Sequence, residues 1–404
     1  MDGLVHLKDI PEEYVQLKDE LLYEIIDSAV KIYGSFSKAS NKLNISFGKL
    51  LKFHPDKNRR RNIQIADLVK LSNFLSENGF DQYSLENLEK NILYIGRNRL
   101  IKYPIFPIDF KTIEGASFIG DIITDGYLGS DLYCGYINSD TNQLYYNLKN
   151  LNKLITKREI KDKGLIKYRI YKTEKNASCI RYPKSIGKII NKIGVTKGKR
   201  VYKNPSLPKF LFNVDKKIFF KFFERVIVNE GWVSVKRINI SHSVANKSLG
   251  ISNFIKNYKE ILLKLGCKTG EPYISSIYNI KNGEEHISWG LWITGRNLDI
   301  IKENCNLNIH YKQKELDKRN NFTTRYNRKD RFNQIIEVCK ELKIFKTKDI
   351  MKRLNLSQKC VTDYLKIGID KSIILKEGNA KNTKYLFNHF NFDANLFRYR
   401  NSHY

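Results

Sequence analysis

Residues 118–126 read FIGDIITDG, an apolar run that ends in an acid and a glycine. The run predicts a helix that stops near Asp125, with a strand just beyond it. Ala116, Gly120 and Thr124 are spaced by four residues and therefore share one helical face. A face of such small residues lets a second helix approach closely, as in tightly packed helix pairs.

A second stretch repeats this layout. Residues 223–231 read FERVIVNEG, so Glu230 lies 105 residues after Asp125 in the equivalent place. Paired helix ends would bring the two carboxylates together, where they repel unless a cation lies between them. Mg²⁺ (or Mn²⁺) prefers oxygen ligands and also binds phosphates. The pair predicts metal-assisted hydrolysis of a phosphodiester, whereas either stretch alone would be a capped core helix.

Charge is the outlying bulk property. The 404 residues include 72 Lys+Arg against 42 Asp+Glu, a net charge of +30 that favours a polyanionic partner such as nucleic acid. No apolar run approaches the roughly 18 residues of a spanning helix, so a membrane partner is not expected. The first residues lack a signal-peptide pattern, which predicts a cytoplasmic protein. The six cysteines form no C-x-x-C pair and the seven histidines are scattered, which argues against a zinc site.

The middle of the chain repeats one order of elements. Residues 101–215 and residues 216–320 each predict helix-strand-strand-helix-strand-strand-helix. We therefore expect an α+β fold in which two pseudo-symmetric αββαββα repeats form one saddle-shaped sheet surface. In the strand predicted at 165–171, Ile166, Tyr168 and Ile170 alternate with Lys167, Arg169 and Tyr171. The first three would face the core, and the second three would face phosphates and bases.

Both ends of the chain predict helix-turn-helix domains. In residues 1–100, two short helices are joined by a turn, with Lys49 and Lys52 on the outer face and a basic run at 57–61. An ordinary helical bundle is the alternative. Residues 325–404 predict a winged helix, for which a protein-interaction module is the alternative. The expected DNA contacts on its second helix are Gln358, Lys359 and Thr362.

The chain resembles the single-chain LAGLIDADG (DOD-type) homing endonucleases of the archaeal type. Residues 118–126 match the first motif at its glycines and its acid, and residues 223–231 match the second at Glu230 and the final glycine. The resemblance covers roughly residues 105–318. Two positions depart from the pattern, since Asp121 replaces an apolar residue and Arg225 replaces a small residue at the helix crossing.

The resemblance implies a DNA-binding saddle and a mechanism. Asp125 and Glu230 would hold Mg²⁺ or Mn²⁺ between two scissile phosphates across a minor groove, and both strands of double-stranded DNA would be cut to leave 3′ overhangs. Basic residues behind the metals would stabilise the developing charge, for which Lys236 and His242 are the candidates. Lys236 is also a candidate DNA contact. Side chains on the two sheet faces would read major-groove edges.

Other functions stay open at this level. A charge at the crossing favours a DNA-binding regulator that has kept the scaffold without cutting, whereas both acids favour the enzyme. An intron maturase would bind folded RNA on the same surface. The chain opens with Met1 and ends without a His-Asn pair, so we expect a free-standing protein and not an intein. Because one chain carries both repeats, we expect a monomer.

Overall fold

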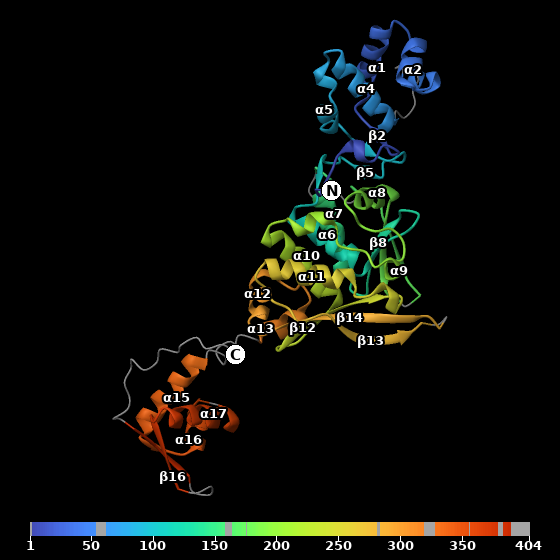
Figure 1. Ribbon diagram of the computed structural model, residues 1–404. Coiled ribbons are helices and arrows are strands. Elements are labelled where there is room, and N and C mark those ends of the chain that lie inside the picture. The colour runs from blue at the N-terminus through green and yellow to red at the C-terminus, as the bar shows by residue number, and fades with distance from the viewer. Residues whose placement is uncertain are drawn as a thin grey trace. The chain divides into compact units, whose positions relative to one another are not determined.

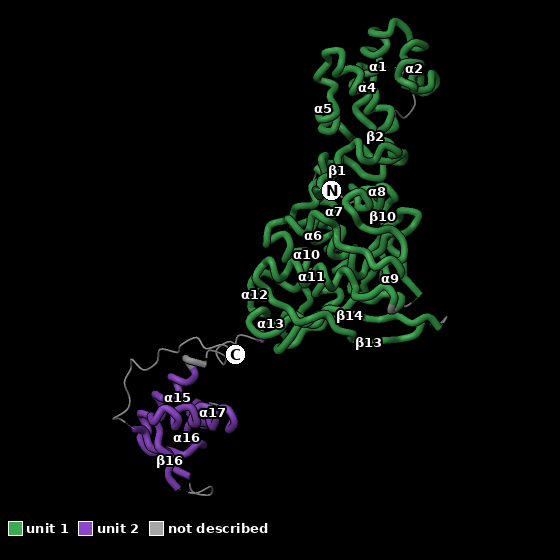
Figure 2. The backbone as a smooth tube through the Cα atoms, in the orientation of Figure 1, with its two compact units in different colours: residues 1–317 green, residues 318–404 purple. Residues whose placement is uncertain are grey.

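The protein is described by a computed structural model that covers residues 2–53, 62–157, 164–174, 176–280, 283–318, 328–354, 356–378 and 383–388. It is a mixed α+β protein with several small antiparallel sheets, which confirms the predicted fold class at that level. The chain divides into two compact units, Met1–Asp317 and Lys318–Tyr404 (Figure 2). The basic run at 57–61 and the tail after residue 388 lie outside the described residues.

The first third of unit 1 is mainly helical and carries one small four-stranded sheet of order β3-β2-β4-β5 (Figure 1). Two further short strands, β1 and β6, pair with each other. The helices are α1 (Asp19–Tyr33), α2 (Phe36–Leu43), α3 (Phe47–Leu51), α4 (Ile65–Glu77) and α5 (Leu85–Glu89). The strands are β1 (Leu4–Val5), β2 (Tyr14–Gln16), β3 (Ile63–Gln64), β4 (Tyr94–Ile95), β5 (Ile101–Lys102) and β6 (Ile108–Asp109).

The next segment forms a four-stranded antiparallel sheet with helices packed against it. Its strand order is β7-β8-β10-β9, so β9 is an edge strand. In chain order its elements are α6 (Ile113–Ile123), β7 (Gly126–Leu128), β8 (Cys134–Asn138), α7 (Thr141–Ile155), β9 (Arg169–Lys172), β10 (Ser178–Tyr182), α8 (Lys184–Lys192) and α9 (Arg200–Lys203).

The last segment of unit 1 has the same succession. Its sheet order is β11-β12-β14-β13, which matches the first sheet strand for strand. Its elements are α10 (Lys216–Glu230), β11 (Gly231–Val233), β12 (Arg237–Val244), α11 (Asn253–Lys264), β13 (Tyr273–Asn279), β14 (Glu285–Thr294), α12 (Asn297–Asn304) and α13 (His310–Asp317). Helices α10 and α11 lie on one face of this sheet (Figure 1).

The prediction of which side chains face the core is wrong for the strand at 165–171. Of the three side chains expected to face the core, only Ile166 is buried, while Tyr168 and Ile170 are exposed together with Arg169 and Tyr171. The reason is that β9 begins at Arg169 and lies at the sheet edge, with all four residues outside the core. Alternation predicts a buried face only where a second layer covers the strand.

The centre of unit 1 is the pair of helices α6 and α10, which pack along each other (Figure 1). Every residue of α6 from Gly115 to Ile123 is buried. The hydrophobic cluster around this pair extends from Val5 to Leu316, so all three segments of unit 1 share it. Burial of these apolar side chains is the main stabilising term for the helix pair.

Unit 2 consists of three helices and a three-stranded sheet of order β15-β17-β16 among its described residues. Its core includes Ile335, Ile350, Val361 and Leu365. The elements are α15 (Arg328–Leu342), β15 (Ile344–Phe345), α16 (Thr347–Leu354), α17 (Gln358–Asp370), β16 (Ile374–Glu377) and β17 (Lys384–Phe387). In the described parts of both units, no helix combines the length and hydropathy needed to traverse a bilayer.

Candidate active site

The ends of α6 and α10 place Asp125 and Glu230 within electrostatic reach of each other. Glu230 is the last residue of α10, and Asp125 follows the last residue of α6 by two positions. The charge of Asp125 helps to raise the pKa of Glu230, and the charges of Arg200 and Lys312 act on the pKa values of both carboxylates. Both side chains are half-buried.

The glycine after each acid is required by close backbone approach. A Cβ on Gly126 would lie 2.6 Å from Ile122 Cα, and a Cβ on Gly231 would lie 2.6 Å from Ile227 O. No side chain fits at such distances, because the chain leaves each helix tightly against its own last turn. The two glycines therefore set the direction of β7 and β11 and the position of the acids before them.

Burial and like charge both disfavour ionisation of the two acids. Loss of hydration raises the pKa of Glu230 to about 7, and Asp125 adds to that shift. Burial is also the largest cause that raises the pKa of Asp125, followed by Asp121, while Lys312 and Arg200 act in the opposite direction. Within the described residues, neither carboxylate accepts a hydrogen bond or forms an ion pair.

Arg200 binds the carbonyl end of α6. Its Nη1 donates to the carbonyls of Ile122, at 2.9 Å, and Ile123. Its Nη2 donates to the carbonyls of Thr124, at 3.0 Å, and Gly126, at 2.5 Å. The carbonyls of Ile122 and Ile123 lie in the last turn of α6 and carry the negative end of the helix dipole, so a cation stabilises them.

Lys312 does the same at α10. Its Nζ donates to the carbonyls of Ile227 at 3.0 Å and Val228 at 2.7 Å. These residues stand three and two positions before Glu230, as Ile122 and Ile123 stand before Asp125. An ammonium has three donors, so one N–H of Lys312 remains for another acceptor. Burial lowers the pKa of Lys312 to about 8, which keeps it mostly protonated at neutral pH.

The two cations come from equivalent places in the two repeats. Arg200 lies eight residues beyond Lys192, the last residue of α8, and Lys312 lies eight residues beyond Asn304, the last residue of α12. Sequence reasoning did not find either residue. The equal spacing after the final helix of each repeat was the available signal, but the sequence alone does not show that both segments fold back onto the helix ends.

Asp121 and Arg225 form a buried ion pair where the helices cross. Arg225 Nε donates to Asp121 Oδ1 at 2.6 Å, and neither side chain is exposed. Gly120 makes room for the arginine, because a Cβ there would lie 2.7 Å from Arg225 Cβ. The two departures from the motif therefore compensate each other in charge. A small residue on one helix is enough for a close crossing.

Further hydrogen bonds satisfy the ion pair and extend it towards the acids. Asp121 accepts from Asn147 and Asn229, each at 3.0 Å. Asn229 also donates to Thr124 Oγ1 at 2.6 Å, which joins the residues directly before Glu230 and Asp125. The crossing is thus a closed polar network, in which buried groups have partners.

The donor set at the helix ends fits a divalent cation that binds oxygen. Two carboxylates without hydrogen-bond partners among the described residues lie in a site where burial, followed by the charge of a neighbouring aspartate, raises the pKa of each. Mg²⁺ is bound in proteins by one or two carboxylates and completes its shell with water or phosphate. In the described part of the chain, no group of three or more His, Cys, Asp and Glu side chains comes together, so a metal caged only by such side chains is not supported.

The two candidates for charge stabilisation are not supported. Lys236 is exposed in the turn between β11 and β12 and is not among the groups that shift the pKa values of Asp125 and Glu230. His242 lines a cavity of about 920 Å³ with Glu230 and Arg200. However, burial lowers its pKa to about 3, so it is neutral at pH 7. Its Nδ1 lies 3.1 Å from Ser252 Oγ.

The predicted nucleic-acid contacts of unit 1 have different environments. Lys49 Nζ donates to Asp67 at 2.8 Å and to Gln64 at 3.3 Å, so it is bonded within the helical segment, whereas Lys52 is exposed. Lys167 Nζ donates to the carbonyl of Asn98 at 2.7 Å. Arg169 is exposed on edge strand β9.

In unit 2, the three predicted contacts lie in α17. Gln358, Lys359 and Thr362 are all exposed. The hydroxyl of Thr362 donates to the carbonyl of Gln358 at 2.8 Å. Ser357 caps the helix by accepting from the amide of Cys360.

Comparison with known proteins adds no relative. No protein-family model matches the chain, and no curated protein matches it significantly. What the site can do must therefore be judged from its own residues. These are two unbonded carboxylates, two cations on equivalent helix ends, and a paired crossing that joins the two helices.

Proposed function

We propose that this protein is a sequence-specific, divalent-metal-dependent DNA endonuclease of the LAGLIDADG homing type. The observation that carries the proposal is the matched construction of the two helix ends. Each end has one acid, one close-packed glycine and one cation on equivalent carbonyls. A structural core would pair the acids, as it pairs Asp121.

In this proposal Asp125 and Glu230 hold Mg²⁺ or Mn²⁺. Bound there, the metal would activate water and stabilise the leaving oxygen of a phosphodiester. Lys312 has one N–H left to donate to a phosphate oxygen, because its other two bind α10 carbonyls. Arg200 fixes the end of α6 through four carbonyls and adds positive potential. Half-burial of both acids keeps bulk water partly away, which strengthens each of these interactions.

The two sheets supply the surface for duplex DNA in this proposal. Exposed apolar and aromatic side chains lie on both, a composition typical of surfaces that a partner covers. They are Ile170, Tyr171, Trp232, Ile274, Ile277, Tyr278 and Trp292. Arg237 stacks over Trp232 and Trp292, at 5.3 Å and 4.8 Å from the ring centroids. The matched strand orders support the two-repeat saddle. Helices α2–α3 and α16–α17 would extend the footprint as helix-turn-helix modules.

The test is a selection from a randomised duplex library with the full chain. Duplexes are recovered by binding in Ca²⁺, and cut ends are recovered in Mg²⁺. We expect one enriched motif that wild type converts to 3′-overhang ends. Asp125→Asn and Glu230→Gln should bind the motif but reduce cleavage by at least roughly 10²–10³-fold, the range for loss of one charge-stabilising group.

Glu260→Gln is the matched control, because Glu260 is exposed on α11 and pairs only with Lys264. It should cut like wild type. A motif that is bound but never cut would instead support the non-cleaving regulator, and enrichment of folded RNA over duplex would support the maturase. Loss of binding in both acid variants would contradict the metal role of the acids.

A further inference from the structure

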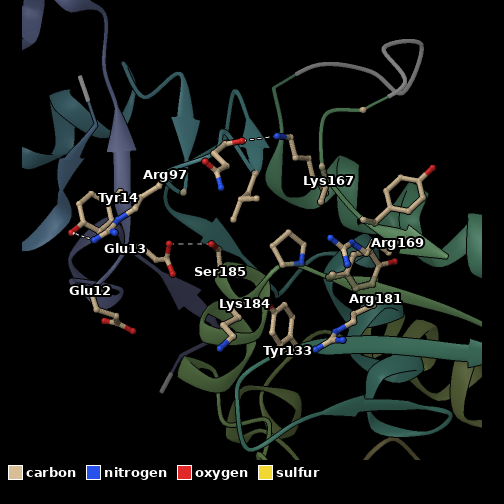
Figure 3. A pocket seen from close by; sticks show the side chains of 18 residues that line it. Glu12, Glu13, Tyr14, Arg97, Tyr133, Lys167, Arg169, Arg181, Lys184 and Ser185 are labelled. Atoms are coloured by element: carbon tan, nitrogen blue, oxygen red, sulfur yellow. Dashed lines mark hydrogen bonds between the residues drawn. The ribbon is translucent and has the colours of Figure 1, made fainter. Parts of the chain in front are cut away.

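A cavity of about 840 Å³ lies where the N-terminal segment meets the first sheet. Figure 3 shows side chains on both sides of it, with Arg97 folded over Tyr14 on one wall and Arg169 and Arg181 on the other. Its volume is within the range of about 300–1,000 Å³ that is usual for small-molecule sites. None of its lining residues belongs to the acid site described above.

Backbone and side-chain bonds tie the two walls together. Lys167 Nζ donates to the carbonyl of Asn98 at 2.7 Å, and its amide donates to the carbonyl of Leu100 at 2.9 Å. On the other side, Ser185 Oγ donates to Glu13 Oε2 at 3.1 Å. These bonds hold the walls in place, so ligand binding needs to immobilise few further side chains.

The charges in the cavity favour an anion. Its described lining has five basic side chains (Arg97, Lys167, Arg169, Arg181 and Lys184) and two acids (Glu12 and Glu13). Both acids are engaged, since Lys188 Nζ lies 2.7 Å from Glu13 Oε1 and 3.6 Å from Glu12 Oε1. An excess of basic groups between low-dielectric walls concentrates positive potential.

Aromatic rings hold the basic groups in place. Arg97 lies over the ring of Tyr14 at 4.1 Å, and its Nη2 donates to the tyrosine hydroxyl at 2.5 Å. Arg181 lies over the ring of Tyr133 at 3.9 Å, with Lys184 at 4.9 Å from the same ring. Stacked guanidinium groups keep in-plane N–H donors for a planar or tetrahedral anion. Arg181 Nε is buried without a hydrogen-bond partner in the described structure.

The cavity continues onto the sheet. A second hollow of about 590 Å³ is lined by Arg169, Ile170, Tyr171 and Arg181, so the two arginines line both spaces. Strand β9, which carries Arg169, is exposed along its whole length. Basic side chains therefore line a continuous path along which a polyanion on the first sheet would reach the cavity.

We propose that this cavity binds a nucleotide of the DNA strand that passes off the first sheet. Arg97 on one wall contacts the phosphate on one side of this nucleotide, and Arg181 and Lys184 on the other wall contact the phosphate on its other side. The exposed ring of Tyr168 packs on the sugar or base. The proposal rests on the proposed function. A free nucleotide carries the same phosphate chemistry, but continuity with β9 favours a nucleotide within a strand.

The test uses the duplex selected in Ca²⁺ and three variants, Arg97→Ala, Lys184→Ala and the control Lys264→Ala. Lys264 is exposed on α11 beside Glu260. Each phosphate of the duplex is replaced in turn by an uncharged methylphosphonate. The affinity of wild type and of each variant is then measured for every substituted duplex. Wild type and Lys264→Ala should lose affinity at two adjacent phosphates outside the cut site. Arg97→Ala should lose little more at one of them, and Lys184→Ala should lose little more at the other.

A salt titration gives an independent readout. Each cavity variant should lower the slope of log K against log[salt] by about 0.9, the value for one phosphate contact in a duplex. Unfolding temperatures within a few degrees of wild type would show that the variants are folded. If base pairs are removed from the duplex end that carries the contacted phosphates, the affinities of the cavity variants and of wild type should become equal.

The failures can be told apart. If wild type binds the duplex and both cavity variants match Lys264→Ala at every phosphate, this proposal is wrong while the proposed function stands. The same conclusion follows if dAMP binds wild type and not Arg97→Ala while the phosphate scan is silent, because the cavity then takes a free nucleotide. If wild type enriches no duplex, both proposals are overturned.

Discussion

The crossing of α6 and α10 differs from their ends in how charge is used. At the crossing, Asp121 has one arginine and two amides as partners, and no charge is left over. At the ends, Asp125 and Glu230 lie close together with no hydrogen bond among the described residues, and burial raises both pKa values. The same helix pair thus contains one carboxylate with three protein partners and two that have none among the described residues.

The difference separates a structural site from the one that we propose to be functional. A buried carboxylate that is fully paired fixes the position of its helix and has no capacity left for a ligand. Carboxylates that repel each other lower stability unless a cation binds, so two of them in one site favour a role in binding one. Arg225 does not argue against catalysis, because it pairs with Asp121 and leaves the helix ends open.

The largest expected effect comes from breaking the crossing. Arg225→Met leaves Asp121 as an uncompensated buried charge, which typically costs about 3–5 kcal/mol of unfolding free energy. Asp121→Asn combined with Arg225→Met removes that charge and should recover at least half of the loss. Denaturant unfolding of the three proteins measures both effects. An Arg225→Met protein as stable as wild type would show that the ion pair does not hold the crossing.

A somewhat smaller effect is expected from the cation at the α10 end. Lys312→Met should reduce cleavage of the selected duplex by roughly 10²–10³-fold, equivalent to about 3–4 kcal/mol, while changing affinity in Ca²⁺ little. Lys314 is exposed on the same helix and Lys314→Met should cut normally. Equal cleavage by the two variants would mean that Lys312 only caps the helix.

The smallest effect concerns the metal-free acids. The folded pKa of Glu230 is raised to about 7, so the unfolded state releases this proton first as pH rises. Stability should therefore fall between about pH 4.5 and pH 7, by up to about 3 kcal/mol. In EDTA, Glu230→Gln should be more stable than wild type at pH 8 and equal to it at pH 4. Equal stability of the two proteins at both pH values would mean that the Glu230 carboxylate is hydrated in the folded protein.

The sequence predicted the parts that local patterns determine. Apolar runs ending in acid and glycine placed the ends of α6 and α10 within a few residues. The repeated order of elements was predicted for the two segments that each form a four-stranded sheet, but the order of the strands within the sheets was not. Strand β10 was not located individually, and β9 was expected to have a buried face. Both errors arise because pairing and layering of short strands are decided by distant residues.

The candidate site was predicted only in part. Asp125 and Glu230 could be named because their motifs repeat, whereas Arg200 and Lys312 lie 75 and 82 residues further along the chain. Their roles depend on tertiary contacts with carbonyls, which carry no side-chain signature. His242 was chosen for its residue type, but burial against Phe254 keeps it neutral.

The ion pair at the crossing has a consequence for assembly. Because Asp121 comes from one repeat and Arg225 from the other, a dimer of two first repeats would bring two aspartates to the crossing, and a dimer of two second repeats would bring two arginines. Like charges buried at an interface oppose association by several kcal/mol. The crossing therefore selects the unlike partner, and we expect halves expressed separately to associate with each other and not with themselves. The ion pair thus works against any symmetric homodimer of either repeat through this crossing.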